Sequence, residues 1–234
     1  MLFRSQSRKM GNTGKLDPSV VLYGHSLGAT VAIHVIASLA NGTLPVSTLK
    51  SNLNLLRNIQ GLILENPFTS IPDMVRVLYG GGAWGKWMPY QYLARFVWDK
   101  WDVRSCLEDL RDGEGGDIEE NEEWKRIRSS CKEEARRILS NALVLVSERD
   151  EVVPRWMGEQ VWEVCQHVAT TTTVLDSCTN SLRSKPETLK GRLVVIPRAL
   201  HEDAWTKNEW VKAIGGYVRE VVIERESSKR GDHL

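Results

Sequence analysis

The stretch VVLYGHSLGAT, residues 20–30, decides how the chain folds, because an apolar run meets a Gly-x-Ser-x-Gly pattern there. The run before Gly24 predicts a buried strand, and the residues after Gly28 have the apolar spacing of a helix. A serine between such a strand and helix lies on a sharp turn that exposes its hydroxyl, as a nucleophile requires. The helix start would also direct the N–H of Leu27 at a developing oxyanion. The alternative is a Ser26 that only caps the helix.

Four continuous apolar runs recur along the chain, at residues 19–24, 61–66, 142–147 and 192–197. Continuous rather than alternating runs are typical of strands that are buried on both faces of a parallel sheet. Helical patterns follow three of these runs, over residues 27–40, 154–166 and 203–225. This alternation predicts an α/β fold with a mostly parallel sheet of about four strands flanked by helices.

The composition excludes several kinds of partner. A chain of 234 residues that is 41% hydrophobic can bury one sizeable core, so we expect a single domain over residues 1–234. The formal net charge of +1 gives no indication of a nucleic-acid partner. No run approaches the roughly 20 apolar residues of a membrane helix, so we expect no transmembrane segment in this chain. The four cysteines form no Cys-x-x-Cys pair, and we expect neither a metal nor a cofactor.

Three segments depart from the alternation of strands and helices. Residues 108–137 are dense in charged side chains and predict a solvated, charged insertion. Residues 168–190 are rich in Thr and Ser and predict a second, polar insertion. Residues 79–105 contain a cluster of tryptophans, which indicates either core packing or a lid or pocket wall over a site.

A serine nucleophile needs a histidine base, and the chain offers five histidines. His201 follows the fourth apolar run by a short loop, so it lies at the carboxyl end of a strand, where open α/β sheets hold their sites. His25 neighbours the serine and is expected to point away from its hydroxyl, and His34 lies inside the following helix. His167 lies beside a polar segment, and His233 lies in a charged tail. His201 is therefore the candidate base.

The acid that orients this base is expected at the same edge of the sheet. Asp150 lies three residues beyond the third apolar run, and Glu148 and Glu151 compete with it by proximity. Glu65, at the end of the second run, is a further alternative, because a carboxylate there could reach the same histidine. A serine, then Asp150, then a histidine is the order found in hydrolases whose nucleophile lies on such a turn.

Four segments together resemble the bud-emergence (Bem-type) branch of the α/β-hydrolases, which are serine hydrolases. They are GHSLGATVAIHVIA, GLILENPFTSIPDMV, ALVLVSERDEVVP and HEDAW. The resemblance implies Ser26 as nucleophile, Asp150 as acid and His201 as base of a Ser-Asp-His triad. It also implies cleavage of an ester, thioester or amide in a small-molecule or acyl substrate, through an acyl-enzyme intermediate and without a cofactor.

The chain departs from this family in how early its nucleophile comes, because Ser26 follows only one run that predicts a strand. The expected fold is therefore a partial α/β-hydrolase fold that lacks the N-terminal strands of the sheet. The strand over residues 19–24 would then be a bare edge, which favours self-association. The loop that supplies a second oxyanion donor would also be missing. The alternative functions are a truncated, catalytically impaired homologue and a non-enzymatic interaction protein.

The start of the chain has no apolar core of the kind that a signal peptide needs. A complete chain is therefore expected in the cytoplasm. Members of the resembled family can carry an N-terminal membrane anchor, and a chain without that anchor would come from a membrane-associated protein.

Overall fold

A five-stranded sheet lies at the centre of the computed structural model, which describes residues 3–4, 20–43, 48–80, 98, 101–111, 122–175 and 191–231. Across the sheet the strands are β1 (Phe3–Arg4), β2 (Val20–His25), β3 (Ile59–Glu65), β4 (Leu143–Ser147) and β5 (Arg192–Ile196). Strands β2 to β5 are parallel, and β1 is antiparallel to β2. The four expected parallel strands are therefore present, each within two residues of its predicted bounds.

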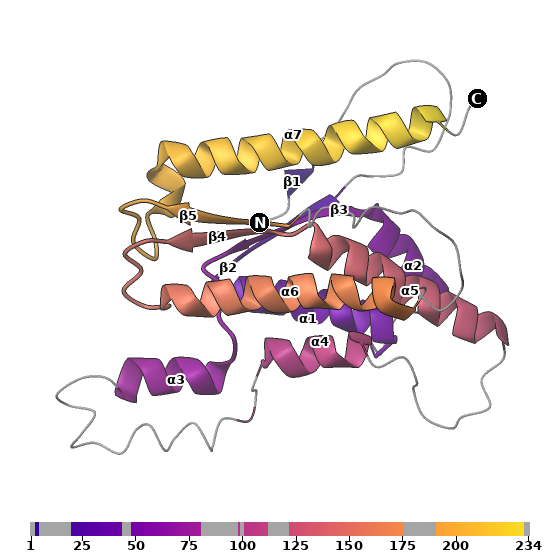
Figure 1. Cartoon of the computed structure of the whole chain (residues 1–234), viewed down its shortest axis with the longest axis horizontal. Coiled ribbons are helices and arrows are strands. Elements are labelled where there is room, and N and C mark those ends of the chain that lie inside the picture. The colour runs from indigo at the N-terminus through magenta and orange to yellow at the C-terminus, as the bar shows by residue number, and fades with distance from the viewer. Residues whose placement is uncertain are drawn as a thin grey trace.

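Helices cover both faces of this sheet (Figure 1). The described helices are α1 (Leu27–Asn41), α2 (Leu49–Asn58), α3 (Ile71–Gly80), α4 (Val103–Arg111), α5 (Glu122–Ser140), α6 (Arg155–Leu175) and α7 (Asn208–Gly231), with a short 3-10 helix, η3, at Ala204–Thr206. Figure 1 shows α7 on one side of the sheet and α1, α4, α5 and α6 on the other. The predicted α/β class is thus confirmed. No helix in the described segments is both long enough and apolar enough to cross a membrane.

The continuous apolar runs of the central strands follow from this layering. In β3, Leu62 and Leu64 belong to the core beneath α1, α4, α5 and α6, whereas Ile63 belongs to the core beneath α7. In β4, Val144 and Leu145 divide between the two cores in the same way. Side chains alternate between the two faces of a strand, so a strand that is covered on both sides needs apolar residues at every position.

The edge of the sheet at β2 differs from the bare edge that the sequence predicts. Phe3 pairs with Val21 and Arg4 pairs with Val20, so β1 covers the start of β2 in antiparallel fashion. An apolar edge strand leaves backbone N–H and C=O groups that need partners, and here a segment of the same chain supplies them. The prediction of a wholly unpaired edge is therefore wrong for the first two residues of β2.

The charged stretch 108–137 is more than a solvated insertion, because its last part belongs to α5. Apolar residues on this helix are buried in the core, namely Cys131, Ala135, Ile138 and Leu139. They recur at three- and four-residue spacing on one helix face, and charged residues occupy much of the remaining surface. The high charge of the stretch thus belongs in part to an amphipathic helix. Residues 112–121 lie outside the described segments.

The other two expected segments fall largely outside the described residues. Of residues 79–105, those at 81–97 and 99–100 are not described, so the lid or pocket wall stays a prediction. Residues 168–175 continue helix α6, and residues 176–190 lie outside the described part of the chain.

Candidate active site

The turn at Ser26, between β2 and α1, has an unusual backbone conformation. Ser26 has φ 52° and ψ −120°, a region that residues other than glycine rarely occupy. Its N–H donates to the main-chain oxygen of Glu65 on β3 at 2.8 Å, which fixes the turn to the neighbouring strand. The Ser26 side chain makes no capping hydrogen bond to the helix. The turn therefore differs from an ordinary helix cap, in which the serine oxygen accepts from the first helical turn.

Gly24 allows this turn to pass close to the helix. A Cβ at Gly24 would lie 2.3 Å from the main-chain oxygen of Gly28 and 2.6 Å from the Cα of Ala29, which is far inside van der Waals contact. A Cβ at Gly28 would meet nothing within 4 Å. The close backbone approach expected of a Gly-x-Ser-x-Gly turn therefore depends on Gly24, whereas Gly28 has room for a side chain.

His201 and Asp150 form a buried pair at the carboxyl end of the sheet. His201 Nδ1 lies 2.8 Å from Asp150 Oδ2, and the two side chains are 6% and 1% exposed. The other carboxylate oxygen accepts hydrogen bonds from the N–H groups of Val152 at 2.8 Å and Val153 at 2.7 Å, which fixes the carboxylate. The hydrogen bond to Asp150 raises the pKa of His201 above its ordinary value of 6.5. Asp150 thus orients the imidazole and stabilises its protonated form.

Glu65, the alternative acid at the end of β3, has different partners. Its carboxylate is buried and accepts hydrogen bonds from the Tyr23 hydroxyl and, at 2.9 Å, from Trp210 Nε1. Burial and the hydrogen bond to this carboxylate raise the pKa of Tyr23. The Glu65 side chain therefore joins β2 to α7, while its main chain holds the turn at Ser26.

The two other competing acids hold the histidine loop by its main chain. Glu148 Oε2 accepts from the N–H of Arg198 at 2.7 Å, and Glu151 Oε2 accepts from the N–H of His201 at 3.1 Å. Within the described part of the chain, Asp150 is the acid that hydrogen-bonds the imidazole itself.

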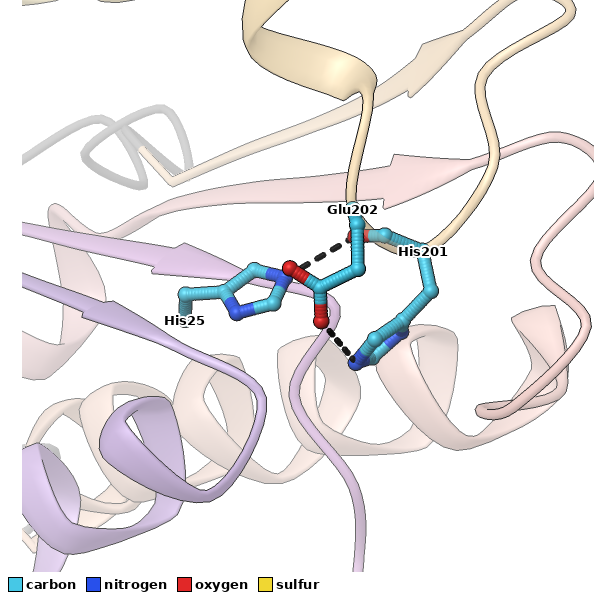
Figure 2. Close-up of side chains that lie close together, drawn as sticks. All are labelled: His25, His201 and Glu202. Carbon is cyan, nitrogen blue, oxygen red and sulfur yellow. Dashed lines mark hydrogen bonds and ion pairs between the residues drawn. The ribbon is translucent and has the colours of Figure 1, made fainter.

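Two residues that the sequence does not single out as functional hold the main-chain oxygen of His201. His25 Nε2 donates to this oxygen at 2.9 Å, and Asn66 Nδ2 donates to it at 3.2 Å. The His25 and His201 rings lie 4.8 Å apart between centroids (Figure 2). His25 therefore links the serine turn to the histidine loop. The sequence signal for Asn66 is its place directly after β3 and before Pro67.

The serine hydroxyl makes no hydrogen bond to the imidazole among the described residues. His201 Nε2, the nitrogen that would accept the serine proton, lies 4.0 Å from Glu202 Oε1 (Figure 2). Catalytic hydrogen bonds are often long in the absence of substrate and tighten when it binds. The structure thus brings Asp150 and His201 into contact, and it places Ser26 on an adjoining turn that His25 ties to the histidine loop.

His25, His201 and Glu202 together could hold a metal ion. Their ligand atoms lie within 4.8 Å of one another, and two histidines with one glutamate are a known set of zinc ligands. A metal bound through His201 Nε2 would occupy the atom that a serine mechanism needs free. Metal binding there and a serine mechanism therefore exclude each other.

A cavity of about 370 Å³ lies next to the segments that follow β3 and β4. Its lining includes Thr69 after β3, Val103 on α4 and Trp156 on α6. None of its lining residues is Ser26, Asp150 or His201, and five of the nine are polar or charged, namely Thr69, Asp73, Asp102, Arg104 and Gln160.

The chain is an α/β protein whose sheet is mostly parallel, and Ser26 lies on the turn between strand β2 and helix α1. The model of the alpha/beta hydrolase family matches residues 8–189, which is most of the chain, and the chain therefore belongs to this family. No curated protein sequence matches the chain.

Two solved structures are similar to this chain at low identity. Carboxyl esterase 2 from the mycorrhizal fungus Tuber melanosporum is 14% identical with a TM-score of 0.37, over 87% of this chain and 50% of the esterase. The esterase domain of a Rhodothermus marinus protein is 14% identical with a TM-score of 0.36, over 86% of this chain and 61% of that domain. The chain thus spans between half and two thirds of the length of either protein, and its family assignment rests on the sequence match.

Proposed function

We propose that the protein is a serine hydrolase of the Bem-type branch that cleaves an ester, thioester or amide. In this proposal Ser26 is the nucleophile, His201 is the base, and Asp150 is the acid that orients the base. The observation that carries the proposal is the 2.8 Å contact between His201 Nδ1 and Asp150 Oδ2, two buried side chains at the carboxyl end of the sheet. The strained turn at Ser26 supports it, because a nucleophile on such a turn stands clear of the sheet.

Acylation begins as Ser26 Oγ attacks the carbonyl carbon of the substrate and His201 Nε2 takes the hydroxyl proton. The carbonyl oxygen becomes an oxyanion that accepts a hydrogen bond from the N–H of Leu27, because the first N–H groups of a helix have no intrahelical partner. The bond to the leaving group then breaks, and Nε2 returns the proton to the departing oxygen, sulfur or nitrogen. Asp150 accepts a hydrogen bond from Nδ1–H in each step and stabilises the imidazolium whenever it forms.

Deacylation repeats these steps with water as the nucleophile. His201 Nε2 takes a proton from the water as its oxygen attacks the acyl carbon, and the oxyanion again forms beside Leu27 N–H. The bond from the acyl carbon to Ser26 Oγ breaks, and Nε2 protonates the serine. The products are a carboxylic acid and the free enzyme.

Labelling with a fluorophosphonate tests the proposed nucleophile directly, because this probe reacts covalently with an activated serine. We expect labelling of the folded chain and of Ser129→Ala, a control at an exposed serine on α5, and none of Ser26→Ala. Circular dichroism shows whether each variant is folded. Folded wild-type protein that takes no label, or a Ser26→Ala variant that labels like the wild type, would contradict the proposed function.

A further inference from the structure

The side chain of Asn66 uses both of its polar atoms where three segments meet. Its Oδ1 accepts from the N–H of Ser147 at 2.8 Å, and its Nδ2 donates to Ser147 Oγ at 3.0 Å and to the main-chain oxygen of His201 at 3.2 Å. Its own N–H donates to the main-chain oxygen of Leu145 at 2.8 Å. Asn66 is 1% exposed. It therefore ties the end of β3 both to the end of β4 and to the histidine loop.

Backbone conformation and contacts together select an asparagine at this position. With φ 46°, Asn66 lies in the left-handed region, where glycine, asparagine and aspartate are the best tolerated residues. Glycine would keep this backbone but lose every side-chain hydrogen bond. Aspartate would keep an acceptor for the N–H of Ser147, but an ionised carboxylate has no proton for the carbonyl of His201.

The two groups that Asn66 joins lead to the proposed acid and the proposed base. Ser147 is the last residue of β4, three residues before Asp150, and His201 carries the imidazole that lies 2.8 Å from that carboxylate. Any shift of the His201 main chain relative to β4 therefore changes the distance between imidazole and carboxylate. His25 Nε2 is a second donor to the same carbonyl at 2.9 Å, so Asn66 is one of two side chains that hold it.

We propose that Asn66 is a positioning residue that sets the geometry of the His201–Asp150 pair and so controls the rate of the reaction. It acts through His201 and not on the reacting atoms. The inference rests on the proposed hydrolase function and extends it to a residue outside the serine, acid and base. Without the amide, the carbonyl of His201 loses one of its two donors, and the imidazole moves away from its bonding position. A misplacement of about 1 Å can lower a catalytic rate about 10²-fold.

The test compares Asn66→Gly with a matched control, Asn52→Ala, in the full chain. Asn52 is also a buried amide, 0% exposed, and its Nδ2 donates to the main-chain oxygen of Leu39 at 3.0 Å, between α2 and α1. Both variants remove a buried amide and both should lose stability. Glycine tolerates the left-handed backbone at position 66, so a change in the His201–Asp150 pair in Asn66→Gly comes from the missing amide.

The first measurement is the proton NMR resonance of His201 Nδ1–H, which the hydrogen bond to Asp150 moves to low field and which needs no activity. We expect it in the wild type and in Asn52→Ala, and we expect its loss or upfield movement in Asn66→Gly. The second measurement is hydrolysis of p-nitrophenyl acetate. Asn66→Gly should lower kcat about 10²-fold with little change in KM, whereas Asn52→Ala should keep the kcat of its folded fraction.

A folded Asn66→Gly with the wild-type resonance and the wild-type kcat would overturn the proposal. If Asn66→Gly does not fold, Asn66→Asp gives the same test, because aspartate keeps the side-chain volume, tolerates the backbone and still accepts from Ser147. A wild-type resonance and a wild-type kcat in Asn66→Asp would overturn the proposal equally. A wild-type chain that has the low-field resonance but neither hydrolyses esters nor takes a fluorophosphonate would contradict the proposed function, and the NMR comparison would still decide the role of Asn66. Absence of the resonance in the wild type would overturn both.

Discussion

Of the four non-glycine residues with positive φ in the described segments, three follow parallel strands, and the fourth, Trp101, precedes helix α4. Ser26 comes directly after β2 with φ 52°, Asn66 directly after β3 with φ 46°, and Arg198 two residues after β5 with φ 57°. Such a conformation in a residue other than glycine costs about 1–3 kcal/mol and persists only where the surroundings enforce it. Here the N–H group of each of these three residues donates a hydrogen bond to a neighbouring segment. The strain is thus concentrated at the end of the sheet that carries the proposed site.

The pKa of His201 sets the pH dependence of the proposed reaction. The hydrogen bond to Asp150 raises this pKa above 6.5, and the imidazole is a base only when neutral, so kcat/KM should rise with pH through a midpoint above 6.5. Asp150→Asn removes the main cause of this shift, and burial then lowers the pKa, so the midpoint should move to lower pH. The maximal kcat should fall about 10⁴-fold, as when other triads lose their acid. Profiles of ester hydrolysis against pH check both effects, and an unmoved midpoint in Asp150→Asn would contradict the assignment.

The two glycines of the Gly-x-Ser-x-Gly pattern should differ in what they tolerate. Gly24→Ala places a Cβ 2.3 Å from the main-chain oxygen of Gly28, so the turn has to shift, at a cost of about 1–3 kcal/mol in stability. We expect this variant to lose fluorophosphonate labelling. Gly28→Ala has open space on helix α1 and should raise the free energy of unfolding by roughly 0.5–1 kcal/mol. Urea unfolding and labelling of the two variants check this, and equal stability changes would contradict it.

Zinc should inhibit the proposed hydrolase at the cluster of His25, His201 and Glu202. Zinc bonds to nitrogen and oxygen are about 2.0–2.2 Å long, so ligand atoms that lie within 4.8 Å have to close on the ion, and the exposed Glu202 is free to move. The bound ion takes His201 Nε2 and stops proton transfer, and EDTA should restore the rate. Glu202→Gln should need more zinc for half-inhibition. Ester hydrolysis at increasing zinc concentration measures this, and equal half-inhibition of both proteins would contradict the site.

Among the elements, helix α7 has one hydroxyl, that of Tyr217, that hydrogen-bonds two main-chain groups of the sheet layer. The Tyr217 hydroxyl donates to the main-chain oxygen of Asn141 at 2.8 Å and accepts from the N–H of Leu62 on β3 at 3.0 Å. Burial raises the pKa of Tyr217 to about 12, so the hydroxyl keeps its proton near neutral pH. Tyr217→Phe leaves a buried N–H and a buried C=O without this partner and should lower the free energy of unfolding by about 1–3 kcal/mol.

The site should not respond to this change in α7, because Asn141 precedes β4 and so lies at the opposite end of that strand from Asp150. Urea unfolding measures the loss of stability in Tyr217→Phe, and ester hydrolysis of the folded protein should give the wild-type kcat. A loss of kcat in the folded variant would contradict a purely structural role for this hydroxyl.

The sequence predicts the strands better than it predicts the helices around them. The strands at 20–25 and 143–147 are visible because burial on both faces leaves an unbroken apolar run. Helix α5 is hidden because its buried face supplies few apolar residues in a stretch that is mostly charged. Helix α2 has Leu49, Leu53 and Leu56 at four- and three-residue spacing, so its helical pattern is readable in the sequence although no helix is expected there above.

The candidate site shows the same division between local and distant signals. Asp150 and His201 are predictable because each follows a recognisable strand and parallel strands end at one edge of a sheet. The contacts of Asn66 and His25 are not predictable in this way, because both donate to the main-chain oxygen of His201. That oxygen lies 135 residues from Asn66 and 176 residues from His25 in the sequence. Every residue has a main-chain carbonyl, so the residue type does not indicate which donor that carbonyl accepts from. Only the folded chain shows this contact.

For the whole molecule, two parallel strands of the described sheet lack full pairing on their outer sides: β5, which lies at one edge, and β2, which β1 covers only in part. Strand β1 pairs with Val20 and Val21, and the described residues provide no partner on that side for the rest of β2. Strands β3 and β4, by contrast, are flanked by strands on both sides. An edge strand with free N–H and C=O groups pairs readily with another chain. We therefore expect the pairing of β1 with β2 to limit self-association through this edge.

Removing β1 should increase self-association through β2. In the double variant Phe3→Pro, Arg4→Pro, neither residue has an N–H for the ladder, so the start of β2 loses the donors of its antiparallel neighbour. The control Phe3→Ala, Arg4→Ala keeps both N–H groups. Light scattering coupled to size exclusion should give a mass that rises with concentration more steeply for the proline variant than for the alanine variant or the wild type. Equal masses for all three proteins at every concentration would contradict the idea that β1 protects this edge.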